Sequence, residues 1–267
     1  MQKYLKAIIA LFTFYAVNWV TELLTQLALI FHNPQFITAI LTGEYTQEHY
    51  GIMHSPEVLG TSYILAAVIV IIFLVNTGVI DKSEMVRTDK IKWVYAIPGI
   101  IGMFIFYYAI EFAMTYLFTG VTDIGGSTYN YGIMLSIYLI LVCPLVEEGI
   151  FRAGVLGNLI KEGMNKWIAV AISALIFGIV HFSWTKLLPT TIFGFMTGWL
   201  YIKSKSIVPS TILHILNNGT AILLTFLTAN GIHSSMIDGM SNVIITIICI
   251  FTLIIATIGT ALYAKKK

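Results

Sequence analysis

Two adjacent glutamates and one arginine stand in a long apolar stretch of this sequence. Glu147, Glu148 and Arg152 lie between residues 131 and 160, where almost every other side chain is apolar. On a helix, Glu148 and Arg152 are one turn apart and can pair, whereas Glu147 points about 100° away. Charge inside a membrane is costly and usually marks a functional site. A structural ion pair would explain Glu148 and Arg152 but not the second carboxylate, so the pattern favours a functional site.

Two further apolar stretches carry histidines at helical spacing. Phe177 and His181 are four residues apart. His214 and Asn218 have the same spacing, so each pair shares one helix face. A single histidine in a membrane helix is often only an interhelical hydrogen-bond partner. Two histidines, an asparagine and two carboxylates on three segments suit the activation of water, with a carboxylate base, a histidine to orient it and donors for an oxyanion.

Taken in order, the three motifs resemble those of the CPBP family. That family comprises the CAAX prenyl endopeptidases of the Ras-converting type and the bacterial bacteriocin-processing and immunity proteins, also called the Abi family. The motifs are Glu147-Glu148-x3-Arg152, Phe177-x3-His181 and His214-x3-Asn218. The resemblance covers residues 131–229, and it implies an intramembrane endopeptidase whose catalytic cavity opens toward the cytosol.

The resemblance also implies roles for the motif residues. Glu147 would be the general base that activates water, and His181 would assist it. His214 and Asn218 would bind the oxyanion or position the scissile carbonyl group. The substrate would be a membrane-associated protein or peptide, whether prenylated or not.

The second glutamate and the arginine would order this site through their ion pair. Phe177 is expected to be a packing residue. The family is often described as metalloproteases, but the sequence contains no HExxH motif. A glutamate-and-water mechanism requires no metal, and we therefore expect no required cofactor. If zinc were used instead, the candidate ligands would be Glu147, His181 and His214.

Composition assigns the whole chain to the membrane. Of 267 residues, 58% are hydrophobic and 10% charged, with a mean hydropathy of +0.87. A soluble domain carries about 25% charged residues, so this composition predicts one integral membrane domain over residues 1–267. The net charge of +2 and the lack of a basic cluster argue against nucleic acid as a partner. Cys143 and Cys249 lie in apolar runs and are predicted to be buried residues outside any disulfide framework.

The hydropathy pattern predicts an all-α protein with about eight transmembrane helices. The first apolar segment is long and lacks a cleavage site, so we interpret it as a retained span. The catalytic core would occupy residues 131–229. The eight predicted segments cover residues 4–30, 58–80, 93–119, 131–160, 167–184, 187–202, 207–229 and 241–264.

The basic residues predict the orientation of these spans. With eight spans, all but two of the 15 lysines and arginines fall on one side, the exceptions being Arg152 inside the membrane and Lys186 opposite. Loops rich in lysine and arginine stay in the cytoplasm. We therefore expect a multi-pass protein of the cell membrane with both termini cytoplasmic. Acidic residues fall on the opposite side: Glu44, Glu48, Glu57, Asp123 and Asp238.

Two other patterns predict helix packing. Gly194 and Gly198 form a GxxxG motif, which usually brings two helices into close contact. Asn18, Glu22 and Gln26 recur every fourth residue on the first span. This polar stripe is expected to face the bundle, either lining the same cavity or forming a proton path.

Straight helices would place the candidate catalytic residues at unequal depths. His214 lies nine residues past Lys205, roughly 13 Å along a helix. Glu147 lies 14 residues before Lys161, roughly 21 Å along a helix. Tilt or a kink would have to reduce this difference. Pro144, just before the glutamates, provides a kink and a freed carbonyl group.

Two other function classes remain open on sequence grounds. One is a bacteriocin-immunity or scaffold protein that shares the fold and does not cleave peptides, although such a role would not need both histidines and the asparagine. The other is a small proton-coupled transporter with Glu22, Glu111 and Glu147 as relay groups. A transporter predicts inverted repeats, and none is visible in the sequence.

Overall fold

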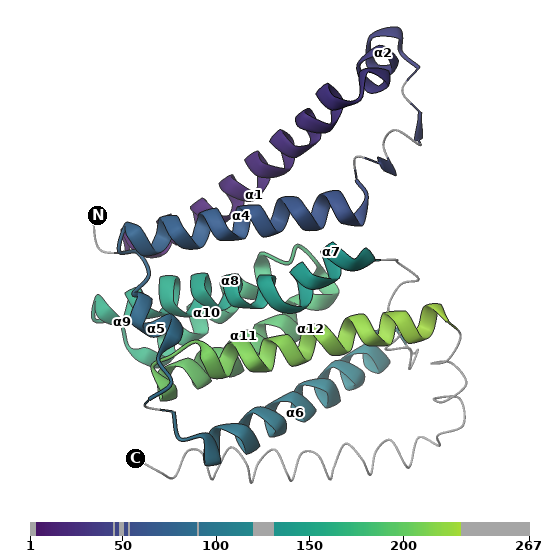
Figure 1. Cartoon of the computed structure of the whole chain (residues 1–267). Helices are drawn as coiled ribbons and strands as arrows, with labels where there is room; N and C mark the ends of the chain where they lie inside the picture. The colour runs from purple at the N-terminus through teal and green to yellow at the C-terminus, as the bar shows by residue number, and fades with distance from the viewer. Residues whose placement is uncertain are drawn as a thin grey trace.

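The computed structural model describes residues 4–44, 46, 47, 51, 52, 54–89, 91–119 and 131–230, and the described residues form helices and no strand (Figure 1). The prediction of an all-α fold is confirmed. The first half contains α1 (Leu5–His32), α2 (Pro34–Thr42), α4 (Pro56–Asn76), α5 (Lys82–Val86) and α6 (Trp93–Thr119). The second half contains α7 (Gly132–Ile137), η1 (Tyr138–Val142), α8 (Cys143–Glu148), η2 (Gly149–Leu156), α9 (Gly157–Lys161), α10 (Lys166–Ile179), α11 (Trp184–Ser204) and α12 (Val208–Ala229).

Five of the described helical stretches are long and apolar enough to cross a membrane. They are Leu5–His32, Pro56–Asn76, Trp93–Glu111, Gly132–Lys161 and Val208–Leu227, and they match predicted segments one to four and seven. The chain is thus a multi-pass membrane protein. Predicted segments five and six correspond to α10 and α11, of which α10 is apolar but has only 14 residues. Outside the described residues lie the eighth predicted segment, Asp123, Asp238, Cys249 and Lys265 to Lys267.

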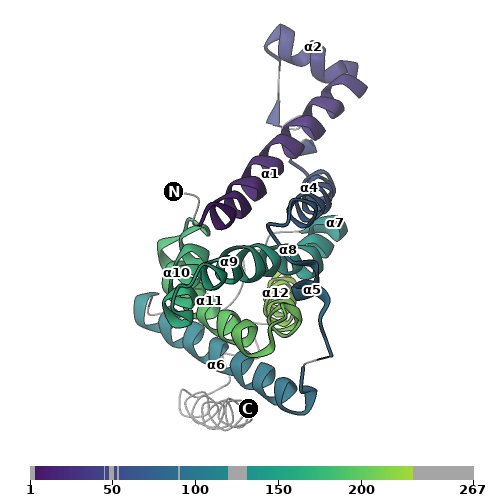
Figure 2. The same ribbon diagram turned by 90° about the vertical axis from the view of Figure 1, so that its left-hand side faces the viewer.

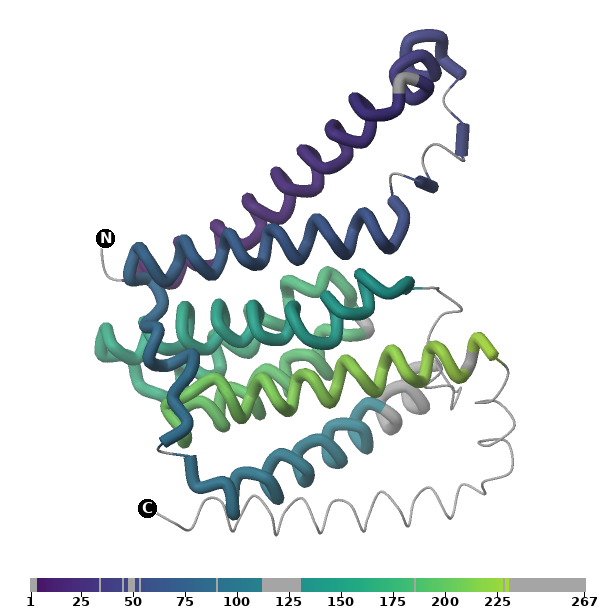
Figure 3. Tube along the Cα trace, viewed as in Figure 1, coloured from purple at the N-terminus to yellow at the C-terminus, as the bar shows by residue number. Residues whose placement is uncertain are grey.

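The stretch of residues 132–161 occupies the middle of the bundle (Figures 1 and 2). It packs against α1 and α4 on one side and against α10, α11 and α12 on the other, and α6 covers the far side of α11 and α12. All eight residues of η2 are buried. The tube in Figure 3 shows α1 beginning beside α4 and then diverging from the bundle toward α2. Glu147, Glu148 and Arg152 therefore belong to the innermost part of the bundle.

Helices α10 and α11 meet through small residues. A Cβ atom on Gly194 would lie 3.0 Å from the Cα atom of Ala174, and one on Gly198 would lie 3.1 Å from Cγ1 of Val170. Such distances leave no room for a larger side chain. The prediction that the GxxxG motif makes a close helix contact is confirmed. This contact fixes the hairpin that carries His181.

The short helix α5 contacts the ends of three inner helices. Its Glu84 carboxylate accepts a hydrogen bond from the Tyr201 hydroxyl group (2.7 Å) and pairs with Lys161 (3.1 Å). The Glu84 carbonyl group accepts the N–H of Ile207 (3.0 Å). A Cβ atom on Gly157 would lie 2.6 Å from the Tyr201 hydroxyl oxygen, so this approach requires glycine. Helix α5 thereby ties α9, α11 and the start of α12 together.

Candidate active site

The predicted ion pair between Glu148 and Arg152 is present and completely buried. Arg152 Nε lies 2.9 Å from Glu148 Oε2, and both side chains have 0% exposure. Arg152 Nη1 also donates to the hydroxyl group of Ser173 on α10 (3.2 Å), which donates in turn to the Phe151 carbonyl oxygen (2.9 Å). Several hydrogen bonds thus hold the guanidinium, as a buried charge requires. The pair joins the 132–161 stretch to α10.

His214 contacts both glutamates. Its Nδ1 atom lies 3.1 Å from Glu148 Oε1, and its Nε2 atom lies 3.7 Å from Glu147 Oε2. A carboxylate paired with arginine can only accept a hydrogen bond, so Nδ1 of His214 carries the hydrogen. The opposite ring nitrogen then faces Glu147, whose side chain is 16% exposed. The imidazole ring therefore bridges a buried carboxylate and a partly exposed one.

Phe177 lies at the centre of the motifs. Its ring centroid is 4.8 Å from that of His181 and 5.8 Å from that of His214, and the Arg152 guanidinium carbon lies 5.1 Å from it. The ring is 1% exposed. Phe177 is a packing residue, as expected, and it packs against residues of the site itself.

His181 lies just beyond the helix on which it was predicted. The predicted segment runs to residue 184, but α10 ends at Ile179, and His181 occupies the following turn. Its Nδ1 atom lies 2.7 Å from the Phe177 carbonyl oxygen, which can only accept, so Nδ1 carries the hydrogen and Nε2 is an acceptor in the neutral ring. Within the described part of the chain, no hydrogen bond or ion pair joins His181 directly to Glu147.

Asn218 satisfies a carbonyl group that Pro144 leaves unpaired. The Cys143 N–H bonds to Tyr138 five residues earlier, which is the spacing of a π-helix. The next bond in this pattern would join Leu139 to Pro144, but proline has no N–H. Asn218 Nδ2 instead donates to the Leu139 carbonyl oxygen (2.9 Å). The freed carbonyl group expected from Pro144 therefore anchors α12 beside the glutamates.

The wide turn of η2 helps to explain why Glu147 and His214 meet, although straight helices would place them at different depths. Its hydrogen bonds reach back five residues, as from Gly157 to Arg152, so it holds more residues per turn than an α-helix. The distance along the helix from Glu147 to Lys161 is therefore shorter than a straight α-helix would make it. Such π-helical turns are frequent at functional sites.

Two contacts of the site were missed at the sequence level. Ser173 binds Arg152, and the Cys143 thiol group donates to Glu147 Oε1 (3.2 Å). Each has a signal in the spacing, since Cys143 lies four residues before Glu147 and Ser173 lies four residues before Phe177. Residues four apart share a helix face. Cys143 and Ser173 are uncharged, so they do not stand out in an apolar stretch as the charged residues do.

The candidate zinc ligands are not grouped as a metal site requires. Among the described residues, no set of three histidine, cysteine, aspartate or glutamate side chains is arranged to hold a metal ion. Glu147 and His214 are neighbours, whereas Nδ1 of His181 is directed at a backbone carbonyl oxygen. The described geometry therefore does not fit a three-ligand zinc site.

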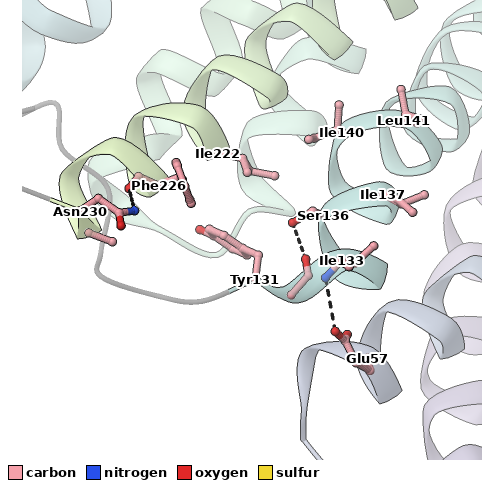
Figure 4. A pocket seen from close by; sticks show the side chains of 12 residues that line it. Glu57, Tyr131, Ile133, Ser136, Ile137, Ile140, Leu141, Ile222, Phe226 and Asn230 are labelled. Carbon is pink, nitrogen blue, oxygen red and sulfur yellow. Dashed lines mark hydrogen bonds between the residues drawn. The ribbon is translucent and has the colours of Figure 1, made fainter. Parts of the chain in front are cut away.

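A cavity of about 790 Å³ lies between α7, η1 and the end of α12, away from the charged cluster (Figure 4). Its walls are mostly apolar, and Glu57 at its edge accepts the N–H of Ile133 (3.3 Å), as Figure 4 shows. Ile140 lines it and lies beside Gly219, next to Asn218 in the chain. The cavity thus approaches the site from one side but contains none of the catalytic candidates.

Comparisons with known proteins agree with the motifs. Residues 129–220 match the family model described as "Type II CAAX prenyl endopeptidase Rce1-like". Two curated relatives are similar: the "UPF0177 protein YxdF" of Lactococcus lactis is 29% identical over 178 residues, which are 60% of this chain and 94% of that protein. The "Putative membrane peptidase YdiL" of Bacillus subtilis is 37% identical over 84 residues, which are 32% of this chain and 34% of that protein, so this match spans about a third of YdiL. No solved structure matches significantly.

Proposed function

We propose that this chain, whose residues 129–220 match the Rce1-like family of type II CAAX prenyl endopeptidases, hydrolyses a peptide bond in a membrane-associated protein or peptide. The family match and the apolar helices support a membrane protein of a peptidase family. We propose in addition the reaction, the roles of the residues and the class of the substrate.

The observation that carries this proposal is the bridge that His214 makes between the two glutamates. Arg152 and Glu148 neutralise each other, and His214 binds Glu148 through Nδ1. The other ring nitrogen of His214, Nε2, faces Oε2 of Glu147 at 3.7 Å. Glu147 then lies beside a group that can exchange a proton with it.

In the proposed reaction, Glu147 removes a proton from a water molecule. The hydroxide oxygen adds to the scissile carbonyl carbon, and the proton stays on Glu147. When the tetrahedral intermediate collapses, the C–N bond breaks, and Glu147 returns the proton to the leaving amine. His181 assists through its exposed Nε2 acceptor, which can hold the water, while His214 and Asn218 donate to the oxyanion or position the carbonyl group.

The proposed mechanism has no metal in it. Zinc held by Glu147, His181 and His214 is the alternative, and the described arrangement of these side chains gives it no support. The helices that carry the site lie in the membrane, so the substrate reaches the site from the bilayer in this proposal.

A cleavage assay tests the proposal. The full chain in lipid nanodiscs is incubated with a panel of membrane-tethered peptides, both prenylated with a CAAX end and unprenylated, and products are identified by mass spectrometry. We expect one peptide class to be cut at a single bond by the wild type and by Glu162→Gln, a change at an exposed turn residue. The Glu147→Gln variant should cut none. A well-folded protein that cuts no peptide and binds a partner would favour the immunity or scaffold alternative.

We also propose that both termini are cytoplasmic. Lysines and arginines collect before α1, around α5, after α9 and after α11, and such loops are retained inside. Single cysteines placed at Lys267 and at Lys82, in a background lacking the two native cysteines, should resist a membrane-impermeant maleimide in intact cells and react after lysis. A cysteine at Glu57 should react in intact cells. The orientation is wrong if the first two react from outside.

A further inference from the structure

The two oxygens of Glu147 have different surroundings. Oε1 accepts a hydrogen bond from the Cys143 thiol group at 3.2 Å. Oε2 faces His214 Nε2 at 3.7 Å. Because a thiol hydrogen bonded to one oxygen restricts rotation of the carboxylate, the other oxygen is held toward the histidine. The thiol thus selects which oxygen is available for proton transfer.

Local backbone geometry fixes the position of this thiol. Cys143 opens α8, and its N–H bonds to the Tyr138 carbonyl group in the π-helical turn. Pro144 follows it immediately, and both side chains are buried. A residue held at a wide turn and followed by proline has little conformational freedom. Cys143 therefore presents its side chain to Glu147, one helical turn later, in a defined direction.

The polar stripe of α1 contacts the neighbouring helix α4. The Tyr63 hydroxyl group on α4 donates to Glu22 (3.4 Å), and Gln26 donates to the other Glu22 oxygen (3.3 Å). The Tyr63 ring in turn packs against that of Tyr138, with 5.1 Å between centroids. The stripe predicted to face the bundle does so through these contacts.

We propose that Cys143 is a positioning residue for Glu147. This inference rests on the proposed peptidase function. Cys143 holds Oε1, so that Oε2, which faces His214, is the oxygen that takes the proton from water.

The test compares two variants at this position in the full chain in nanodiscs. Cys143→Ala removes the donor, and Cys143→Ser replaces the thiol with another donor. We expect Cys143→Ala to lower kcat about five- to tenfold, the effect of one ordinary hydrogen bond, with little change in KM. Cys143→Ser should retain at least half of the activity.

A pH profile separates positioning from mere packing. Besides Cys143, Glu147 is faced by His214 from α12, by Tyr15 from α1 and by its neighbour Glu148, and these stay unchanged in Cys143→Ala. Loss of a donor to the ionised carboxylate should move the acidic limb of the kcat profile to higher pH. A variant with wild-type kcat and pH profile overturns the inference, and so does a Cys143→Ser variant as inactive as Cys143→Ala but equally stable. If Glu147→Gln is active, it is the peptidase proposal that fails.

Discussion

Replacement of Glu147 by glutamine is expected to abolish peptide cleavage and to leave the folded protein almost unchanged. Glutamine has nearly the same shape but cannot take a proton from water. Loss of a general base typically costs 10²–10⁴-fold in rate. Glu147 is partly exposed, and Arg152 pairs with Glu148 and not with Glu147, so the change leaves no buried arginine unpaired. We therefore expect kcat/KM to fall by at least about 10³-fold, while the thermal unfolding temperature stays within a few degrees of wild type.

Two further variants measure how much His181 and Asn218 contribute to cleavage. His181→Ala should also abolish cleavage at normal stability, since His181 lies in an exposed turn. Asn218→Ala should leave residual activity, because loss of one oxyanion donor costs about 10²–10³-fold. It should also lower the unfolding temperature, because Asn218 binds the Leu139 carbonyl oxygen.

The same assay decides the metal question. Chelators should leave wild-type cleavage unchanged in the proposed mechanism. Loss of activity with a chelator, restoration by zinc and one bound metal per chain would instead make the glutamate and two histidines ligands. Full activity of Glu147→Gln would remove the catalytic assignment altogether.

Replacement of Arg152 by alanine is expected to have the largest effect on folding. The change leaves the Glu148 carboxylate buried at 0% exposure without its compensating charge. Breaking a buried ion pair in this way costs about 3–5 kcal/mol of folding free energy. It also removes the hydrogen bond to Ser173 and the charge above Phe177. We expect a much lower yield of folded protein in the membrane, and little activity in what remains.

Variants of its partner provide the controls. Glu148→Asp keeps the charge and should be milder than Glu148→Ala in both yield and cleavage. The double variant Glu148→Gln/Arg152→Gln removes both charges, so it should recover folded yield relative to Arg152→Ala without recovering activity. An Arg152→Ala protein that accumulates, unfolds and cleaves like wild type would show that the pair has no ordering role.

Residue types and spacing were enough to predict the helical fold, the buried ion pair and the proximity of the three motifs to one another. Charge is rare in this chain, so each charged or polar residue in a span carries much information. The pairing of Glu148 with Arg152 follows from helix geometry alone. The GxxxG contact follows from residue size. The family resemblance is confirmed by the match over residues 129–220.

The other features of the site depend on contacts between residues that are far apart in the sequence, which no local pattern reveals. The π-helical turns arise from packing along the 132–161 stretch, and they change both the depth of Glu147 and the partner of the Leu139 carbonyl group. That His214 would contact both glutamates could not be read from its spacing to Asn218. The early end of α10 was also missed, because Val180, His181 and Phe182 are as compatible with a helix as with the turn that they form.

The shortness of α10 sets a condition on the surrounding lipid. Its 14 residues rise about 21 Å, against about 30 Å for an ordinary hydrocarbon core. At the following turn, Phe182 and Trp184 are 87% and 91% exposed, and exposed tryptophan rings settle at the headgroup level. A bilayer adapts to a short hydrophobic element by thinning around it. Lipid headgroups and water then come closer to the depth of His181. The length of the lipid chains therefore helps to determine how easily water reaches the peptide bond.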